Sequence, residues 1–458
     1  MNPGIHKEEV QKEKPVFTLK QIAEHKTEDD CWVAIDSSVY NITNWLSKHP
    51  GGKSVLFNFA GTDCSDEFRI FHYNPNYKRL KAFRVGTLHP DDQRKDTAVS
   101  KDLQELHARI KSEGAFLPDY WFYAGRAAII LSLFAVSAYL FNYTPSLWTC
   151  AASGFFLGLA WQQLAFVGHD IGHHVVSHDH KIDDNLGIVF GNFLQGISLE
   201  WWKHSHNTHH TVTNSVTHDP DIQHLPFLAV NKAFFKSIFS KYYYKTLNFD
   251  KVSEFFIAKQ HYLFYVVMGL ARFNLYAQSF RHNLVGAGST HTRKNIELVS
   301  LFGFWVWLLT VLSLTPTWWH TAVFVLVSHA VAGIVHVQIC INHFPMKVYE
   351  GVPQKAFTND GYLMSQLMTT RDIECPPFMD FFHGGLQFQI EHHIFPHLTR
   401  SHLRRVQDEL KKICKKHDLP FQNVPFWRAN WDVIVKLYET SKELKISEIF
   451  MDGINMNG

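Results

Sequence analysis

The strongest constraint on the fold of this chain is a set of long apolar stretches. Four of them, at 121–141, 147–168, 298–315 and 319–341, approach the roughly 20 apolar residues that a helix needs to cross a bilayer. Two further apolar stretches, 186–200 and 262–280, are interrupted by glycine, polar residues or Arg272, and we interpret them as interfacial or re-entrant. The sequence therefore predicts a membrane domain with four spanning helices.

Charge predicts the orientation of these helices. The connections Phe141 to Ser146 and Pro316 to Trp318 contain no Lys or Arg, whereas the N-terminal segment, 169–297 and the C-terminal segment are rich in both. The positive-inside rule then places these three segments in the cytosol, with the spans paired as two hairpins. The alternative is a large soluble protein with buried helices. The net charge of only +2 argues against a nucleic-acid partner.

The distribution of charge also predicts the domain boundaries. We expect a disordered tail at 1–15, a compact α+β domain at 16–90, a linker at 91–118, an all-α membrane domain at 119–430 and a C-terminal tail at 431–458. The first residues are polar and lack the apolar core of a secretory signal. The 6 cysteines form no CxxC pair, which favours a reducing compartment over a disulfide framework.

Two histidines in the first domain have the spacing of haem ligands. The turn His49-Pro-Gly-Gly52 is followed by Gly61-Thr-Asp and then by Phe71-His72. Two axial imidazoles must come from separate helices on opposite sides of a porphyrin, and the glycines allow the sharp turn that brings one of them to the iron. This segment resembles the cytochrome b5 family. The resemblance implies a haem b held by His49 and His72, which carries electrons and has no open site for a substrate.

Three histidine clusters lie in the membrane domain, all on its predicted cytosolic side. They are His169-Asp-Ile-Gly-His173-His174, His206-Asn-Thr-His209-His210 and Gln389-Ile-Glu-His392-His393. Residues three and four apart share a helix face, so each helix offers a convergent set of imidazoles. A single zinc needs only about four protein ligands, so this many histidines favour two metals. A fused one-electron donor favours redox chemistry, which indicates iron.

These motifs together resemble the membrane fatty-acid desaturases, specifically the front-end class with an N-terminal cytochrome b5 domain and glutamine at the start of the third histidine box. The resemblance spans about 16–430. It implies two non-haem irons ligated by seven box histidines, with Gln389 tuning the site. These seven are His169, His173, His206, His209, His210, His392 and His393. His343 matches a further ligand position, and His174 a less constant one. His204, His383 and His397 lie near the boxes and are left unassigned.

The resemblance also implies the reaction and its partners. We expect a cis double bond to be inserted into an acyl-lipid or acyl-CoA substrate with O2 and NADH-derived electrons, which cytochrome b5 reductase passes to the haem. We favour Δ6 desaturation of C18 precursors such as linoleic and alpha-linolenic acid. The expected location is the endoplasmic reticulum membrane, with the haem domain and the histidines in the cytosol.

Several alternatives remain open. Plant-type sphingolipid Δ8 long-chain-base desaturases resemble this chain in 383–393 and in Asp219-Pro-Asp221. A lipid hydroxylase would use the same ligands, and a membrane electron carrier would lack catalytic iron. Asp219, Asp221 and the pair Trp201-Trp202 lie beside the second cluster. They either orient ligands or a lipid headgroup, or only cap a helix and lie at the membrane interface.

Overall fold

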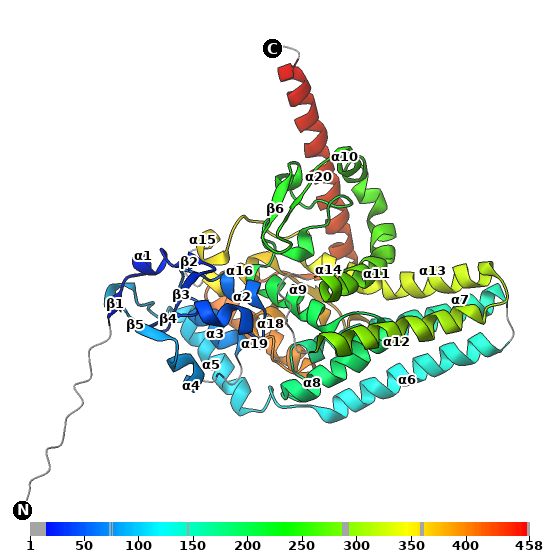
Figure 1. The fold of residues 1–458 in the computed structure, drawn as a ribbon, viewed down its shortest axis with the longest axis horizontal. Helices are drawn as coiled ribbons and strands as arrows, with labels where there is room; N and C mark the ends of the chain where they lie inside the picture. Colours follow the sequence, from blue (N-terminus) through cyan, green and yellow to red (C-terminus); the bar gives the residue numbers. More distant parts are fainter. Residues whose placement is uncertain are drawn as a thin grey trace, which may run out of the picture. The chain divides into compact units, whose positions relative to one another are not determined.

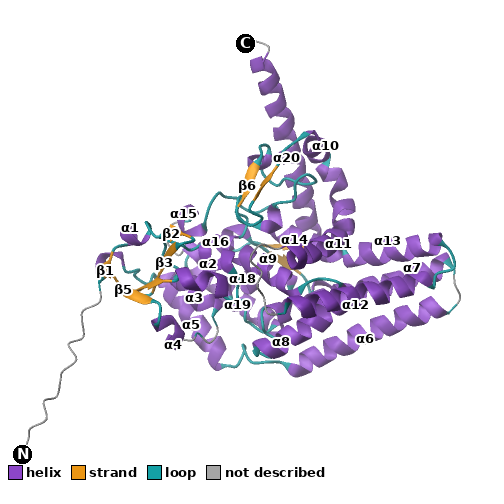
Figure 2. Ribbon diagram, in the orientation of Figure 1, coloured by secondary structure: helices purple, strands orange, loops and turns teal. Residues whose placement is uncertain are grey.

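The computed structural model describes residues 15–72, 75, 77–143, 146–285, 293–357 and 361–455. The tail predicted at 1–15 therefore lies outside the described residues except for Pro15. The chain divides into two compact units, Met1–Asp96 and Thr97–Gly458. Strands form the sheet of the first unit, and helices dominate the second (Figure 2).

The first unit is built on a five-stranded sheet in the order β1-β5-β4-β3-β2. Strands β1 and β5 are parallel and the other pairs are antiparallel. The strands are β1 (Val16–Phe17), β2 (Lys26–Thr27), β3 (Asp30–Ile35), β4 (Ser38–Asn41) and β5 (Arg84–Leu88). The helices are α1 (Leu19–Ile22), η1 (Thr43–Lys48), α2 (Lys53–Phe57), α3 (Ser65–Phe71), α4 (Tyr77–Lys81) and η2 (Pro90–Asp92).

The side chains of β3 point alternately to the two faces of the sheet, and each face packs against its own buried cluster. Cys31, Val33 and Ile35 point to one face and pack with Leu46 and Phe59, as expected for side chains with a period of two. Ala34, on the other face, joins a second buried cluster with Ile22, Val39 and Leu88. Both faces of the sheet are therefore covered, and the predicted α+β domain is confirmed.

Four helical segments of the second unit are long and apolar enough to cross a membrane, which confirms the four predicted spans. They run side by side in Figure 1 as α6, α7, α12 and α13. Their bounds are Tyr120–Asn142 (α6), Leu147–Gly172 (α7), Lys294–Ser313 (α12) and Trp318–His343, the last consisting of α13 (Trp318–Ala332) and α14 (Ile334–His343). Helix α7 continues to Gly172, past residue 168, the predicted end of the second span, so the first histidine box begins inside this helix.

Small residues bring the second and fourth spans into backbone contact. A Cβ on Gly154 would lie 2.8 Å from the carbonyl oxygen of Phe324, and one on Gly158 would lie 2.6 Å from that of Ser328. Glycines spaced in this way are typical of closely packed membrane helices. The ends of α7 and α14 are thereby held together, and both ends carry histidines.

The remaining elements of the second unit surround this end of the spans. Residues 186–200 form the end of α8, a π-helical segment η3 and the start of α9, while 262–280 lies inside α11. The α-helices are α5 (Ala98–Ser112), α8 (His180–Gly187), α9 (Leu199–Val212), α10 (Lys251–Ile257), α11 (Gln260–Val285), α15 (Pro353–Ala356), α16 (Gly361–Thr369), α17 (Asp380–His383), α18 (Gln389–Ile394), α19 (Leu403–Lys416) and α20 (Phe426–Asn455). Helix α5 occupies most of the predicted linker.

Short elements complete the unit. They are η3 (Ile188–Phe193), η4 (Pro220–Ile222), η5 (Lys232–Phe234), η6 (Pro377–Met379), η7 (Leu386–Phe388), η8 (Arg400–His402), the strand pair β6 (Ile238–Ser240) and β7 (Lys245–Leu247), and the strand pair β8 (Asp372–Glu374) and β9 (Asn423–Pro425). The domain boundary predicted at 430 falls inside α20. Ala429, Val433 and Leu437 of that helix are buried in one core cluster with α11 and α14, so this part of α20 belongs to the unit.

Candidate metal centre

The first histidine box lies at the C-terminal end of α7. His169 is in the last turn of the helix and His173 follows its final residue, so the two rings lie 4.8 Å apart between centroids. Gly172 lets α9 approach, because a Cβ there would lie 2.0 Å from the ring of Trp202. The ring of Trp202 in turn stacks on His206 at 4.4 Å. One of the two neighbouring tryptophans therefore packs directly against the histidines.

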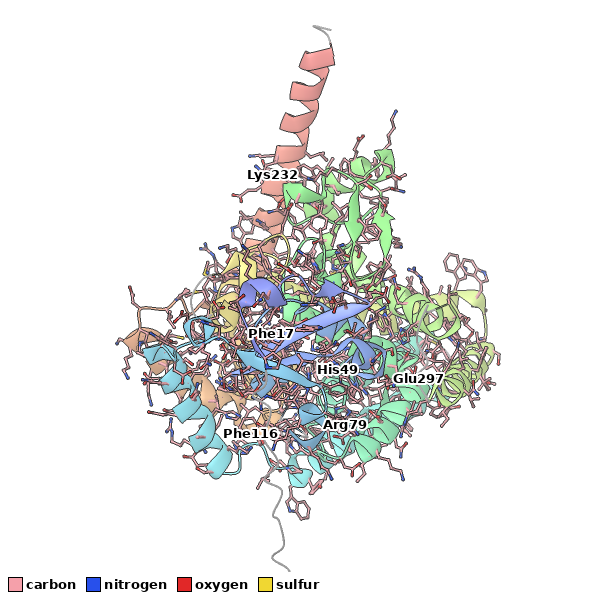
Figure 3. All side chains as sticks on the ribbon, turned by 60° about the vertical axis from the view of Figure 1, so that its left-hand side comes forward. Phe17, His49, Arg79, Phe116, Lys232 and Glu297 are labelled. Atoms are coloured by element: carbon pink, nitrogen blue, oxygen red, sulfur yellow. The ribbon has the colours of Figure 1, made fainter. Side chains whose placement is uncertain are left out.

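The second box lies on α9, whose N-terminus is fixed by a neighbouring span. Ser198 caps the helix by accepting from the backbone N–H of Trp201. The Glu297 side chain of α12 accepts from the hydroxyl of Ser198 and from the backbone N–H of Glu200; Glu297 is labelled in Figure 3. A carboxylate at the N-terminus of a helix is favourable for the helix dipole. The register of α9 is thus tied to the beginning of the third span.

The third box forms α18, which follows a turn that only glycine allows. Gly384 and Gly385 have φ of 59° and 100°, in the region that is strained for other residues. A Cβ on Gly384 would also lie 2.0 Å from the ring of Phe166. Asp372 then accepts from the backbone N–H of Ile390 at 2.9 Å, which fixes the first turn of α18. His392 and His393 therefore enter the same region as the other two boxes.

Four box histidines form what we call the first group: His169, His173, His206 and His392. Their ligand atoms all lie within 4.8 Å of one another. Nε2 of both His169 and His173 is buried and has no hydrogen-bond partner among the described residues. His210 borders the group, with its Nε2 3.0 Å from Nε2 of His206 and 3.0 Å from that of His392.

Three further histidines form the second group: His209, His343 and His393, again within 4.8 Å of one another. Gln389 lies beside the second group: its Nε2 is 3.1 Å from Nε2 of His343 and 3.3 Å from Nε2 of His393. The nitrogen and oxygen of an amide can exchange places by a flip of the side chain, so either atom of Gln389 can face these imidazoles.

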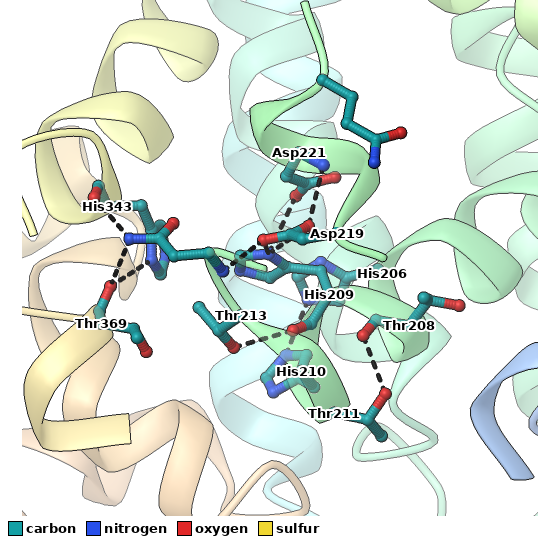
Figure 4. Close-up of polar contacts among 12 residues, drawn as sticks. His206, Thr208, His209, His210, Thr211, Thr213, Asp219, Asp221, His343 and Thr369 are labelled. Carbon is teal, nitrogen blue, oxygen red and sulfur yellow. Dashed lines mark hydrogen bonds and ion pairs between the residues drawn. The ribbon is translucent and has the colours of Figure 1, made fainter. Parts of the chain in front are cut away.

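The outer nitrogen of each imidazole in the second group is held by an oxygen. His209 Nδ1 lies 3.0 Å from a carboxylate oxygen of Asp219, a contact that Figure 4 shows. His343 Nδ1 faces the backbone oxygen of Thr369 at 3.2 Å, and His393 Nδ1 faces the side-chain oxygen of Gln366 at 2.8 Å. Outer partners of this kind fix the tautomer of metal-binding histidines and orient them.

Burial keeps most of these rings neutral. Desolvation lowers the pKa of His173, His206 and His392 well below its ordinary value, and repulsion between neighbouring imidazoles lowers it further. Neutral imidazole is the form that binds a metal ion. His209 differs: desolvation lowers its pKa, but attraction to Asp219 and Asp221 outweighs that effect and raises the pKa to about 9.

Four other predicted or unassigned histidines lie outside both groups. His174 has a left-handed backbone with φ of 56°, which turns its Nε2 to a carboxylate oxygen of Asp184 at 3.1 Å. Its predicted place in the metal centre is therefore not supported by the geometry. His204 Nδ1 contacts the hydroxyl of Tyr242, His397 Nδ1 contacts the backbone oxygen of His173, and the ring of His383 packs on Phe426.

The two predicted haem ligands of the first unit, His49 and His72, face each other from separate elements. His49 follows η1 and His72 follows α3, with their rings 5.9 Å apart between centroids; Figure 3 labels His49. Nδ1 of His72 lies 2.9 Å from the backbone oxygen of Phe68, and Nδ1 of His49 is 3.4 Å from that of Gly52. Nε2 is then the nitrogen on the opposite side of each ring, as axial ligation of a haem requires.

The residues that orient the histidines and fix the third box have little signature in the sequence. Gln366, Thr369 and Asp372 lie between the fourth span and the third box, within residues 344–382, which contain no histidine and no recognisable motif. All three are fully buried, although Gln and Asp are mostly exposed residues. Only their burial and their contacts identify them.

A pocket borders the first group on the side of the third box. Its lining combines ligand candidates with the apolar and charged residues Phe166, Asp170, Leu386, Pro396, Leu398 and Arg400. Arg400 is paired there with Asp170 at 2.6 Å, and the hydroxyl of Tyr123 donates to the same carboxylate at 3.0 Å. His169, His173 and His392 line the same pocket.

Comparison with known proteins gives two family matches. Residues 146–425 match the family described as Fatty acid desaturase, and residues 18–89 match the family described as Cytochrome b5-like Heme/Steroid binding domain. The first match contains both histidine groups, and the second contains His49 and His72.

Individual relatives are similar along nearly their whole length. The Delta(8)-fatty-acid desaturase of Helianthus annuus is 38% identical, over 91% of this chain and 89% of that protein. The Acyl-lipid (9-3)-desaturase of Borago officinalis is 36% identical, over 94% and 95%. The Delta 8-(E)-sphingolipid desaturase of Emericella nidulans is 38% identical, over 91% and 92%.

Proposed function

Because this chain belongs to the fatty acid desaturase family and carries its own cytochrome b5-like domain, we propose that it is a front-end lipid desaturase with one iron in each histidine group. The observation that carries the proposal is the convergence of the three boxes and His343 into two adjacent groups of buried imidazoles. Imidazole also suits zinc, copper and nickel; zinc has no redox chemistry, and iron is the redox metal that we propose here. Bound there, two irons would supply the oxidation of an unactivated methylene by O2, which no side chain can perform.

The residues of this chain hold, orient and shield that site. His169, His173, His206 and His392 would hold the first ion, with His210 beside them; His209, His343 and His393 would hold the second, with Gln389 beside them. Burial of these rings excludes water from the reacting carbon. The apolar spans would enclose the lipid chain, and the pocket that Arg400 lines is a candidate approach to the first group.

His49 and His72 hold a haem b in the first unit. A haem held between two imidazoles would have no open position for a substrate and would act only as an electron carrier. We propose that the electrons come from NADH through cytochrome b5 reductase. The protein is a membrane protein, and we propose the endoplasmic reticulum as its location, with the haem and the histidine groups on the cytosolic side.

For the substrate, we propose Δ8 desaturation of a sphingolipid long-chain base. The relatives named for Δ8 desaturation include both plant and fungal proteins at 38% identity. The Δ6 acyl activity expected from the sequence is the second candidate, and the similarity to the Acyl-lipid (9-3)-desaturase supports it. The names of all three relatives favour desaturation over hydroxylation.

The test is product analysis in a host that lacks the activity. The full chain is expressed with labelled C18 fatty acids, and both fatty acids and sphingoid bases are analysed by mass spectrometry. A new Δ8 double bond confined to sphingoid bases supports the proposal, whereas a Δ6 bond in acyl chains supports the second candidate. A product that gains one oxygen atom, or double-bond formation by a His392→Ala variant at a normal protein level, contradicts the assignment.

A further inference from the structure

We propose that Asp219 is a positioning residue that keeps the second histidine group loaded with metal, and that it compensates for the glutamine at position 389. The inference rests on the proposed function, because it requires one metal ion in each group. It assigns a role to a carboxylate that is fully buried and that touches neither the first group nor the pocket beside it.

The His209 ring lies between the second group and this carboxylate. Its Nδ1 is 3.0 Å and 3.1 Å from the two oxygens of Asp219, whereas its buried Nε2 has no hydrogen-bond partner among the described residues. Nδ1–H therefore donates to Asp219, and Nε2 is the nitrogen that is left to face the second group. Asp221, whose nearest oxygen is 3.7 Å from the same Nδ1, lies on the carboxylate side of the ring.

The carboxylate of Asp219 is itself held in place by the backbone. One oxygen accepts from the N–H of Asn214 at 2.6 Å and the other accepts from the N–H of Asp221 at 2.9 Å. Asn214 is anchored in turn, because its side-chain amide donates to the backbone oxygen of His343 at 2.9 Å. Figure 4 shows Asp219 and Asp221 beside His209, with His343 in the same region. Asp219 thus cannot turn away from His209 without breaking several bonds.

The second group needs a negative partner more than the first does. It contains three imidazoles and the neutral carboxamide of Gln389, and an amide is a weaker metal donor than imidazole. The outer partners of His343 and His393 are the neutral oxygens of Thr369 and Gln366. A carboxylate partner raises the basicity of a ligating histidine, so Asp219 strengthens the His209 bond where Gln389 is weak.

The first group is arranged differently. It has four imidazoles within reach of one ion, and His210 lies beside them. Asp170, the carboxylate next to His169, is 3.5 Å from Nδ1 of that ring and forms a closer ion pair with Arg400 at 2.6 Å. Its charge is therefore already compensated. The structure thus assigns the charged outer partner to the group that has the weaker set of donors.

The experiment measures non-haem iron in the purified full chain, by elemental analysis corrected for haem and by Mössbauer spectroscopy after growth on enriched iron. Asp219→Asn removes the charge but keeps the size of the side chain. Loss of an outer partner lowers metal affinity about 10–100-fold, so we expect this variant to lose close to one of two non-haem irons. One of the two iron environments should vanish while the haem content stays the same.

Two further variants separate this role from a general effect on folding. Asp184→Asn is the matched control, because Asp184 also contacts an imidazole, that of His174 at 3.1 Å, but lies outside both groups; it should retain two irons. Adding Gln389→His to Asp219→Asn supplies a stronger donor and should restore the second iron.

The proposal is overturned if Asp219→Asn keeps both irons with an unchanged spectrum. It is equally overturned if the variant loses both irons together, because Asp219 would then only support the loop, or if Gln389→His restores nothing. A parent protein without non-haem iron would instead refute the proposed function, so the two failures are distinguishable.

Discussion

At the scale of single residues, two adjacent histidines at the end of α7 have opposite environments. His173 belongs to the first group, whereas His174 is turned to Asp184. We expect His173→Ala to reduce desaturation by more than about 100-fold, beyond the effect of losing an outer partner. His174→Ala should retain most of the activity. Both variants are compared by product yield per unit of protein; equal losses in the two would show that the ring orientation at this position is wrong.

The haem ligands allow a second prediction at this scale. His49 and His72 come from separate elements and face each other, so removing one imidazole leaves an axial position empty. We expect His49→Ala to lose the absorption band of reduced haem and most of the desaturase activity, even when free cytochrome b5 is added. The absorption spectrum and a product assay measure the two effects. A normal band would exclude His49 as an axial ligand.

The histidines can be predicted from the sequence better than the residues that orient them. Imidazoles at i, i+3 and i+4 indicate a shared helix face from their spacing alone. The positive φ of His174 has no signature in the sequence, and the contact of Gln366 with His393 joins two segments 27 residues apart. Asp219 lies close to the second box in the sequence, but only the fold shows that it faces His209 rather than solvent.

At the scale of secondary-structure elements, the approach of α7 to α9 depends on one glycine. A side chain at Gly172 would meet the ring of Trp202, whereas Gly125 on α6 has no neighbour within 4 Å. We expect Gly172→Ala to cost about 1–3 kcal/mol through overpacking and to reduce non-haem iron. Gly125→Ala should be neutral or stabilising by up to about 1 kcal/mol.

Thermal unfolding in detergent and iron analysis of the two glycine variants provide the measurement. An unchanged unfolding temperature for Gly172→Ala would mean that α9 can shift without loss of stability, which would contradict this prediction.

The four membrane-spanning helices can be predicted from the sequence, since each needs only a long apolar run. The end of the domain is not predictable in this way, because α20 buries Val433 and Leu437 against residues far away in the chain.

At the scale of the whole membrane unit, all three boxes must lie on one side of the bilayer. Helices α7 and α14 both end at the metal centre, and α6 begins there, because Tyr123 contacts Asp170. We expect the connections around 143–146 and 314–317 to face the lumen and the boxes to face the cytosol. Glycosylation tags inserted into each connection and beside each box measure which side of the membrane each segment faces. Modification of a tag near any box would contradict the arrangement.

The central claim is that imidazoles from three separate stretches converge on a pair of irons that a haem in the same chain can reduce. The most direct test is to count metals in the purified, active protein, with total iron from elemental analysis and haem from its absorption. We expect one haem and two non-haem irons per chain. Active protein that contains haem but no non-haem iron would contradict the claim.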